Sequence, residues 1–532
     1  MNNQLAFSDY LVFIIYFLIV ASYGYMIYRR RKSREHDSKA FFLAEGSLTW
    51  WAIGASLIAS NISAEQFIGM SGNGFFVGIA VSAYEWLAAL ALVIIAVWFI
   101  PIYLKNKIYT MPQFLKTRYN ETVALIMAIF WLFLYVFVNL TSILYLGAIA
   151  INGLLPGHEY LHTVMIALAI FAVIITLGGM KVIGYTDVIQ VTVLIIGGFA
   201  TIYMALSVVA EKFGTGSGVI DGFTTLMREA PEHFHMILDK PTAASSQQDI
   251  DKYLIIPGIL MYAAGQWIVN LNYWGCNQYI TQRALGADLK TARTGILFAA
   301  MLKLMMPIIV MLPGIAAYVL NKSGKLDVVG GMDGAYSAVL GFLPTGLKGL
   351  SIAALTAAIV ASLAGKANSI STIFTLDIYK KYINTAAEEK KLVITGRVVV
   401  VCAMIVAVLF TWDDLLGIGG AGGFTFIQKY TGFISPGVFA MFLLGMFWKR
   451  TTGTAAIVGL LTGFGLSVFF NEFAPAVMGH ETFLYTAYPN GKGGFEIPFL
   501  ICMGLAFMFT IIVMVLLSLA GPKINPKAFE LD

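Results

Sequence analysis

Charged residues and cysteines are scarce in this sequence. Only 12% of its 532 residues are Asp, Glu, Lys or Arg, whereas 59% are hydrophobic. A soluble chain of this length would need a far more polar surface, so the composition indicates a polytopic helical membrane protein. The three cysteines, Cys276, Cys402 and Cys502, lie far apart in or beside apolar segments. Their spacing argues against a disulfide framework and against a metal site built from cysteine ligands.

Sequence motifs for catalysis are missing as well. We find no cluster of metal ligands, no phosphate-binding glycine loop and no nucleophile with a matching base, and the six His residues are scattered. No low-complexity tract or flexible linker divides the chain. We therefore expect one transmembrane domain over residues 1–532 that is not an enzyme and has no nucleic-acid partner. The net charge of +5 is better explained by membrane topology.

Hydropathy predicts about thirteen membrane-spanning helices. The predicted spans are 8–28, 49–71, 77–104, 122–149, 161–179, 182–207, 252–273, 291–318, 349–377, 395–412, 424–447, 453–473 and 496–520. Most of the 34 Lys and Arg residues fall in segments that are cytoplasmic if the N-terminus lies outside. The positive-inside rule therefore predicts an outer N-terminus and an inner C-terminus. No basic region precedes the first segment, so we expect a retained helix rather than a signal peptide.

Two polar interruptions indicate an internal repeat. Asn61–Gln66 interrupts the second predicted span, and Asn270–Gly275 interrupts the seventh. Polar groups at bilayer depth are tolerated where they line a protein cavity, and broken helices of this kind carry the binding sites of secondary transporters. The five spans over 49–207 and the five over 252–447 each begin with an interruption. They predict a 5+5 inverted repeat, with an additional N-terminal helix (8–28) and two C-terminal helices (453–520).

Several stretches resemble the solute:sodium symporter family, and in particular its sodium/glucose cotransporters. The stretch from Gly54 to Met70 resembles the first core helix of that family. Further similar stretches are Tyr84–Trp86, Thr186–Gln190, Tyr273–Gln278, Thr375–Tyr379 and Ile427–Gly432. The resemblance covers essentially the whole chain. It implies the leucine-transporter-like fold, a location in the lipid bilayer of the cell's inner (plasma) membrane, and sodium-coupled symport of a glucose- or galactose-like monosaccharide.

A sugar site needs hydrogen-bonding groups around the hydroxyls and an apolar or aromatic face against the ring. The resemblance implies sugar contacts from Gln66, Glu85, Asn270, Lys303 and Gln428, an inner gate of Tyr273 held by Asn61, and an outer gate of Met70, Tyr84 and Phe424. The residues alone leave alternatives open. Amide side chains within helices also join neighbouring helices, and Glu85 with Lys303 also fits a structural ion pair. Glu65 is expected to hydrogen-bond within the broken helix. A family serine is replaced by Ala88, which leaves the preferred sugar open.

The expected sodium site is where the sequence departs from the family. The resemblance implies carbonyl ligands at Ala59, Ile62 and Ala358 and two consecutive serine hydroxyls. Here Ala361 precedes Ser362, so one hydroxyl is missing. Lys366 follows Ser362 by one helical turn on the same face, and we expect Asp187 to be its partner. Two interpretations stay open: Lys366 extends into an aqueous inner vestibule, or its ammonium takes the place of the cation.

Three functions are therefore compared. The main prediction is a sodium-coupled sugar symporter. The alternatives are a sodium-independent or proton-coupled sugar carrier, in which Lys366 replaces the cation, and a sugar sensor that binds without transport. The complete set of predicted gates favours a carrier.

Overall fold

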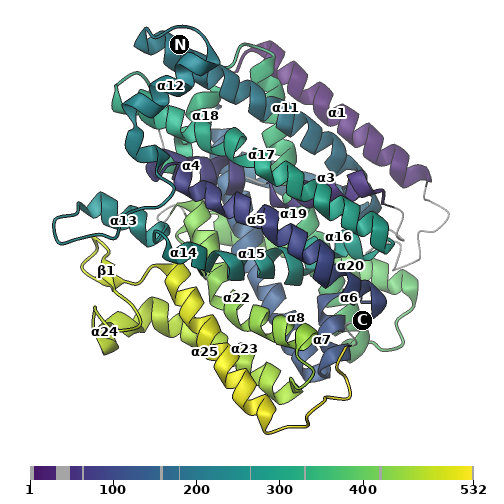
Figure 1. The fold of residues 1–532 in the computed structure, drawn as a ribbon. Helices are drawn as coiled ribbons and strands as arrows, with labels where there is room; N and C mark the ends of the chain where they lie inside the picture. The colour runs from purple at the N-terminus through teal and green to yellow at the C-terminus, as the bar shows by residue number, and fades with distance from the viewer. Residues whose placement is uncertain are drawn as a thin grey trace.

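Long helices packed side by side make up almost all of the protein's regular structure (Figure 1). The structure is a computed structural model that describes residues 5–30, 48–62, 65–108, 110–155, 160–178, 180–263, 265–328, 331–418 and 422–529. The helices α1 (Phe7–Arg30) and α25 (Phe499–Leu519) lie on opposite sides of the molecule in Figure 1.

Each predicted span has a helical counterpart. In the first predicted repeat these are α3 (Trp50–Asn61) with η3 (Glu65–Met70) and α4 (Ser71–Phe76), η4 (Ile79–Ser82) with α5 (Ala83–Ile94), η5 (Ile95–Phe99) and α6 (Ile100–Lys105), α8 (Glu121–Leu134) with η6 (Tyr135–Leu140) and α9 (Thr141–Asn152), α10 (Leu161–Leu177) and α11 (Met180–Phe213). In the second they are α13 (Gln247–Ile255) with α14 (Leu260–Ala263) and α15 (Gly265–Cys276), α17 (Leu289–Lys322), α19 (Leu347–Thr372) with η10 (Ile373–Ile383), α20 (Glu389–Thr411) and α22 (Gly423–Phe447). The helices α23 (Gly453–Val468), η11 (Phe469–Phe473), α24 (Ala474–Met478) and α25 follow.

Shorter elements connect these helices. They are α7 (Met111–Arg118), α12 (Val219–Glu229), η8 (Pro231–Phe234), α16 (Gln278–Leu285), η9 (Gly331–Gly334), α18 (Ala335–Leu340), and the antiparallel pair of β1 (Tyr488–Pro489) and β2 (Phe495–Glu496). Among the described residues, ten helices are long and apolar enough to cross a membrane, or eleven with the bent helix pair that ends in α15. The exact number of spans, the orientation and the division into repeats stay predictions.

The first predicted interruption is present, whereas the second is misplaced. Helix α3 ends at Asn61 and the π-helical η3 begins at Glu65, with residues 63 and 64 outside the described ranges. Helix α15 continues through Asn270–Gly275. The chain instead bends by 83° between α14 and α15. The prediction for Asn270–Gly275 was wrong because its amide side chains find partners without breaking the helix: Asn270 donates to Gln266 and Asn272 donates to Ser435.

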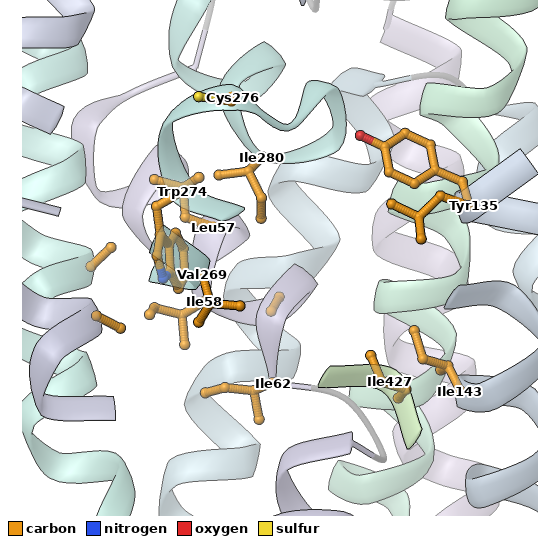
Figure 2. Close-up of a cluster of buried hydrophobic side chains, with 14 of the residues drawn as sticks. Leu57, Ile58, Ile62, Tyr135, Ile143, Val269, Trp274, Cys276, Ile280 and Ile427 are labelled. Atoms are coloured by element: carbon orange, nitrogen blue, oxygen red, sulfur yellow. The ribbon is translucent and has the colours of Figure 1, made fainter. Parts of the chain in front are cut away.

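Close helix packing brings the interrupted region to the centre of the protein. Helix α17 packs on α3 and α5, helix α19 packs on α3 and α11, and α22 packs on α15 and η3. A Cβ atom added at Gly54 would lie only 2.7 Å from the carbonyl oxygen of Gly295, so glycine is needed for the close approach of α3 to α17. Figure 2 shows Leu57 of α3 and Trp274 of α15 in the same buried apolar cluster.

Candidate substrate-binding site

A cavity lies where η3, α5, α15, α17 and α22 meet. Its lining includes the predicted sugar contacts and most of the predicted gate residues, namely Asn61, Gln66, Tyr84, Glu85, Asn270, Tyr273, Lys303, Phe424 and Gln428. Met70 is not among the lining residues, and it is fully buried in η3. The structure therefore brings together residues that the sequence distributes over both predicted repeats.

Glu85 of α5 and Lys303 of α17 form a buried ion pair in the cavity wall. The Lys303 Nζ atom lies 2.5 Å from Glu85 Oε2, and the two side chains are 1% and 3% exposed, respectively. Lys303 Nζ also lies 5.3 Å from the centre of the Trp274 ring, a distance typical of a cation–π interaction. Burial of two charges has a large desolvation cost, so intramembrane pairs of this kind usually serve a function. At a cavity wall the pair offers both a donor and an acceptor to a ligand.

Glutamine and threonine side chains supply further polar groups. Gln428 of α22 donates a hydrogen bond of 3.3 Å to Glu65 Oε1, which joins α22 to η3. This bond differs from the expectation that Glu65 bonds within the broken helix. Gln66 Oε1 and Thr431 Oγ1 are buried and have no hydrogen-bond partner among the described residues. An unpaired buried oxygen costs about 1–3 kcal/mol, so a ligand hydroxyl that donates to it would be favoured.

Aromatic residues also line the cavity. The rings of Tyr84 and Phe424 meet edge to face, with centroids 5.0 Å apart and an angle of 90°. Elsewhere in the lining, the Asn61 side chain at the end of α3 donates a hydrogen bond of 3.0 Å to the hydroxyl of Tyr273 on α15. This contact between Asn61 and Tyr273 agrees with the sequence analysis, whereas the gating role of either pair stays a prediction.

The expected sodium site contains a buried lysine. Ala59 and Ile62 lie at the end of α3, and Ala358 and Ser362 lie on α19, which packs against α3. Lys366 is only 1% exposed, so it does not extend into an aqueous vestibule, and that interpretation was wrong for this structure. The ligand roles of these residues stay predictions.

The expected pairing of Lys366 with Asp187 was also wrong. The Ser56 hydroxyl links Asp187 to Arg283. Ser56 Oγ donates a hydrogen bond of 2.5 Å to Asp187 of α11 and accepts one of 2.8 Å from Arg283 Nε of α16. Arg283 and Asp187 also attract each other electrostatically. The carboxylate that attracts Lys366 is that of Glu65. The assignment failed because α16 packs on α3 and α19 and brings Arg283 to Asp187.

The sequence analysis missed several residues of this region. Trp274, Asn277, Asn139 and Thr431 also line the cavity. Trp274 could have been found, because it follows Tyr273 directly in a stretch that resembles the family. Arg283 looked like one of the cytoplasmic basic residues, and no sequence signal distinguishes it from them. Lys429 of α22 lies 3.7 Å from Glu472 of η11 in a partly exposed ion pair.

Comparisons with known proteins point to one family. A family model described as "Sodium:solute symporter family" matches residues 41–463. The chain is 45% identical to the sodium/glucose cotransporter of Vibrio parahaemolyticus over 500 residues, which cover 91% of this chain and 89% of the relative. It is 34% identical to human sodium/myo-inositol cotransporter 2 over 86% of this chain and 68% of the relative.

A solved structure shows the same fold. A Na⁺-coupled sialic acid symporter in a substrate-bound outward-open state superposes with a TM-score of 0.80 at 20% sequence identity, covering 98% of this chain and 99% of that one. The predicted all-α, leucine-transporter-like fold is confirmed.

Proposed function

Because the chain belongs to the sodium:solute symporter family, we propose that it is a sodium-coupled symporter of a monosaccharide. The family and the relatives are sodium-coupled transporters, so the chain is a multi-pass carrier of the plasma membrane and not an enzyme. The relatives transport sugars or sugar-like polyols, as their names state, and a glucose- or galactose-like hexose is the proposed substrate.

The cavity between η3, α5, α15, α17 and α22 is the proposed sugar site. The observation that supports it is that groups suited to sugar hydroxyls line a single cavity together with aromatic rings. These groups are Gln66, Glu85, Asn270, Lys303 and Gln428. Lys303 would donate to a hydroxyl oxygen, Glu85 would accept a hydroxyl proton, and the Tyr273 ring would contact the apolar face of the sugar.

We propose that alternating access works through two contacts in the cavity lining. In the proposed cycle, Tyr84 and Phe424 separate to admit sugar from outside, and the Asn61–Tyr273 hydrogen bond breaks to release it inside. A single hydrogen bond contributes about 0.5–1.5 kcal/mol, so breaking it presents a small barrier. The sodium gradient supplies the energy for accumulation. No contact among the described residues favours a sensor over a carrier.

The proposal can be tested by uptake into proteoliposomes. Radiolabelled glucose, galactose and myo-inositol would be offered with an inward sodium gradient and with choline replacing sodium outside. We expect concentrative uptake of at least one hexose, reduced uptake in Gln66→Ala, and normal uptake in Lys429→Met. Lys429 is a suitable control because it lies on α22, as Gln428 does, but pairs with Glu472 outside the cavity. A folded protein that takes up none of the three compounds would contradict the proposal.

A further inference from the structure

The C-terminal end of α3 and the facing turn of α19 form a position suited to a cation. Helix α3 ends at Asn61, so the carbonyl groups of its last turn carry the negative end of the helix dipole. Half-helix ends of this kind coordinate cations in secondary transporters. Ser362 of α19 faces this end: its hydroxyl is buried and donates a hydrogen bond of 3.0 Å to the carbonyl oxygen of Ser60.

A lysine ammonium lies beside the Ser362 hydroxyl. Lys366 Nζ donates a hydrogen bond of 3.3 Å to Ser362 Oγ, from one helical turn further along α19. Ala361, the residue before Ser362, is buried and has no side-chain oxygen. Of Ala361 and Ser362, only Ser362 can therefore offer a side-chain hydroxyl to a cation. That hydroxyl already accepts a hydrogen bond from Lys366.

The buried charges on the described residues of this region balance. Among those residues three carboxylates are buried here, Glu65, Glu85 and Asp187, at 5%, 2% and 1% exposure. Three cationic side chains, each 1% exposed, accompany them: Lys366 attracts Glu65, Lys303 pairs with Glu85, and Arg283 meets Asp187 through Ser56.

An added sodium ion would therefore leave an uncompensated positive charge. Like charges repel strongly at short distance in a medium of low dielectric constant. The residues around Ser362 fit an ammonium better than a sodium ion in this arrangement.

We infer that the Lys366 ammonium occupies the cation position between α3 and α19 and competes there with sodium. Sodium enters this position only when Lys366 moves away, so this chain needs more sodium than a variant without the lysine. The inference rests on the proposed function in that sodium is the coupling ion. It goes further by naming a built-in competitor for that ion.

The test measures binding of ²²Na⁺ to the purified full-length protein, without sugar, over a range of sodium concentrations. The variants are Lys366→Met and Ala361→Ser with Lys366→Met, and Lys429→Met is the control, because it removes a lysine from an ion pair away from α3. We expect the half-saturating sodium concentration to fall by at least about tenfold in both Lys366 variants and to stay unchanged in the control. The same half-saturating concentration in wild type and both Lys366 variants would overturn the inference.

Loss of the lysine leaves Glu65 buried without its cation, and this could prevent folding. The double variant Lys366→Met with Glu65→Gln removes both charges. Its half-saturating sodium concentration should fall as in the other Lys366 variants, and an unchanged value would overturn the inference. Binding of radiolabelled hexose to the same samples separates the two proposals. A shift in ²²Na⁺ binding without hexose binding in any sample would contradict sugar transport and leave the competition intact. If the samples bind hexose but wild type and the Lys366 variants give identical sodium-binding curves, the sugar site is supported and the competition is overturned.

Discussion

The buried pair of Glu85 and Lys303 gives the sharpest test of the proposed sugar site. The two charged atoms are 2.5 Å apart and the side chains are at most 3% exposed. Removal of one partner leaves an uncompensated buried charge, which typically costs about 3–5 kcal/mol of stability. We therefore expect Lys303→Met and Glu85→Gln each to lower the thermal unfolding temperature of the purified protein markedly. The double variant removes both charges of the pair and should regain most of the lost stability.

Sugar binding to the same double variant distinguishes a structural pair from a sugar contact. Hydrogen bonds to charged groups contribute about 1.5–3 kcal/mol, so loss of even one should weaken hexose affinity by at least about tenfold. The measurement is equilibrium binding of radiolabelled hexose. Lys429→Met is the control, because its partly exposed pair with Glu472 should contribute less than about 1 kcal/mol. A double variant that regains stability and binds hexose with wild-type affinity would refute the role of the pair in the sugar site.

Three further predictions concern the cavity and the short helix η9. Tyr273→Phe loses the hydrogen bond from Asn61 but keeps the ring, so hexose affinity should fall by no more than about tenfold. Tyr273→Ala also loses the ring, and its hexose affinity should fall much further. Equal losses of affinity in the two variants would assign the role to the hydroxyl instead of the ring. Gln66→Ala removes a buried oxygen that has no protein partner among the described residues, so hexose should bind about 2- to 13-fold more weakly, and an unchanged dissociation constant would exclude Gln66 from the site. Burial raises the pKa of Asp333, in η9 between α17 and α18, to about 6 from its ordinary 3.8. The folded protein then holds this proton more tightly than the unfolded chain, so wild type should lose thermal stability relative to Asp333→Asn as pH rises from about 4 to 7; a difference independent of pH would contradict this.

Much of the fold and of the candidate site was predictable from local patterns in the sequence. Apolar runs of membrane-spanning length predicted the helices, because each such segment must satisfy its backbone hydrogen bonds internally in the bilayer. The polar residues Asn61–Gln66 predicted the first break for the same reason. Stretches that resemble the family predicted residues that the structure then placed around one cavity, such as Gln66 and Lys303. All of these signals are carried by neighbouring residues along the chain.

Only the tertiary structure decided which buried charges meet. Lys366 was expected to pair with Asp187, but its ammonium lies beside Ser362 and is attracted by Glu65. Arg283 had been read as one of the cytoplasmic basic residues, yet it is buried and approaches Asp187 through Ser56. The hydropathy of a segment indicates that it crosses the membrane, but it does not show how the helix is rotated or which side chains of neighbouring helices face it. Those pairings depend on how α3, α11, α16 and α19 pack together, because electrostatic partners are chosen by distance in space and not by separation along the sequence.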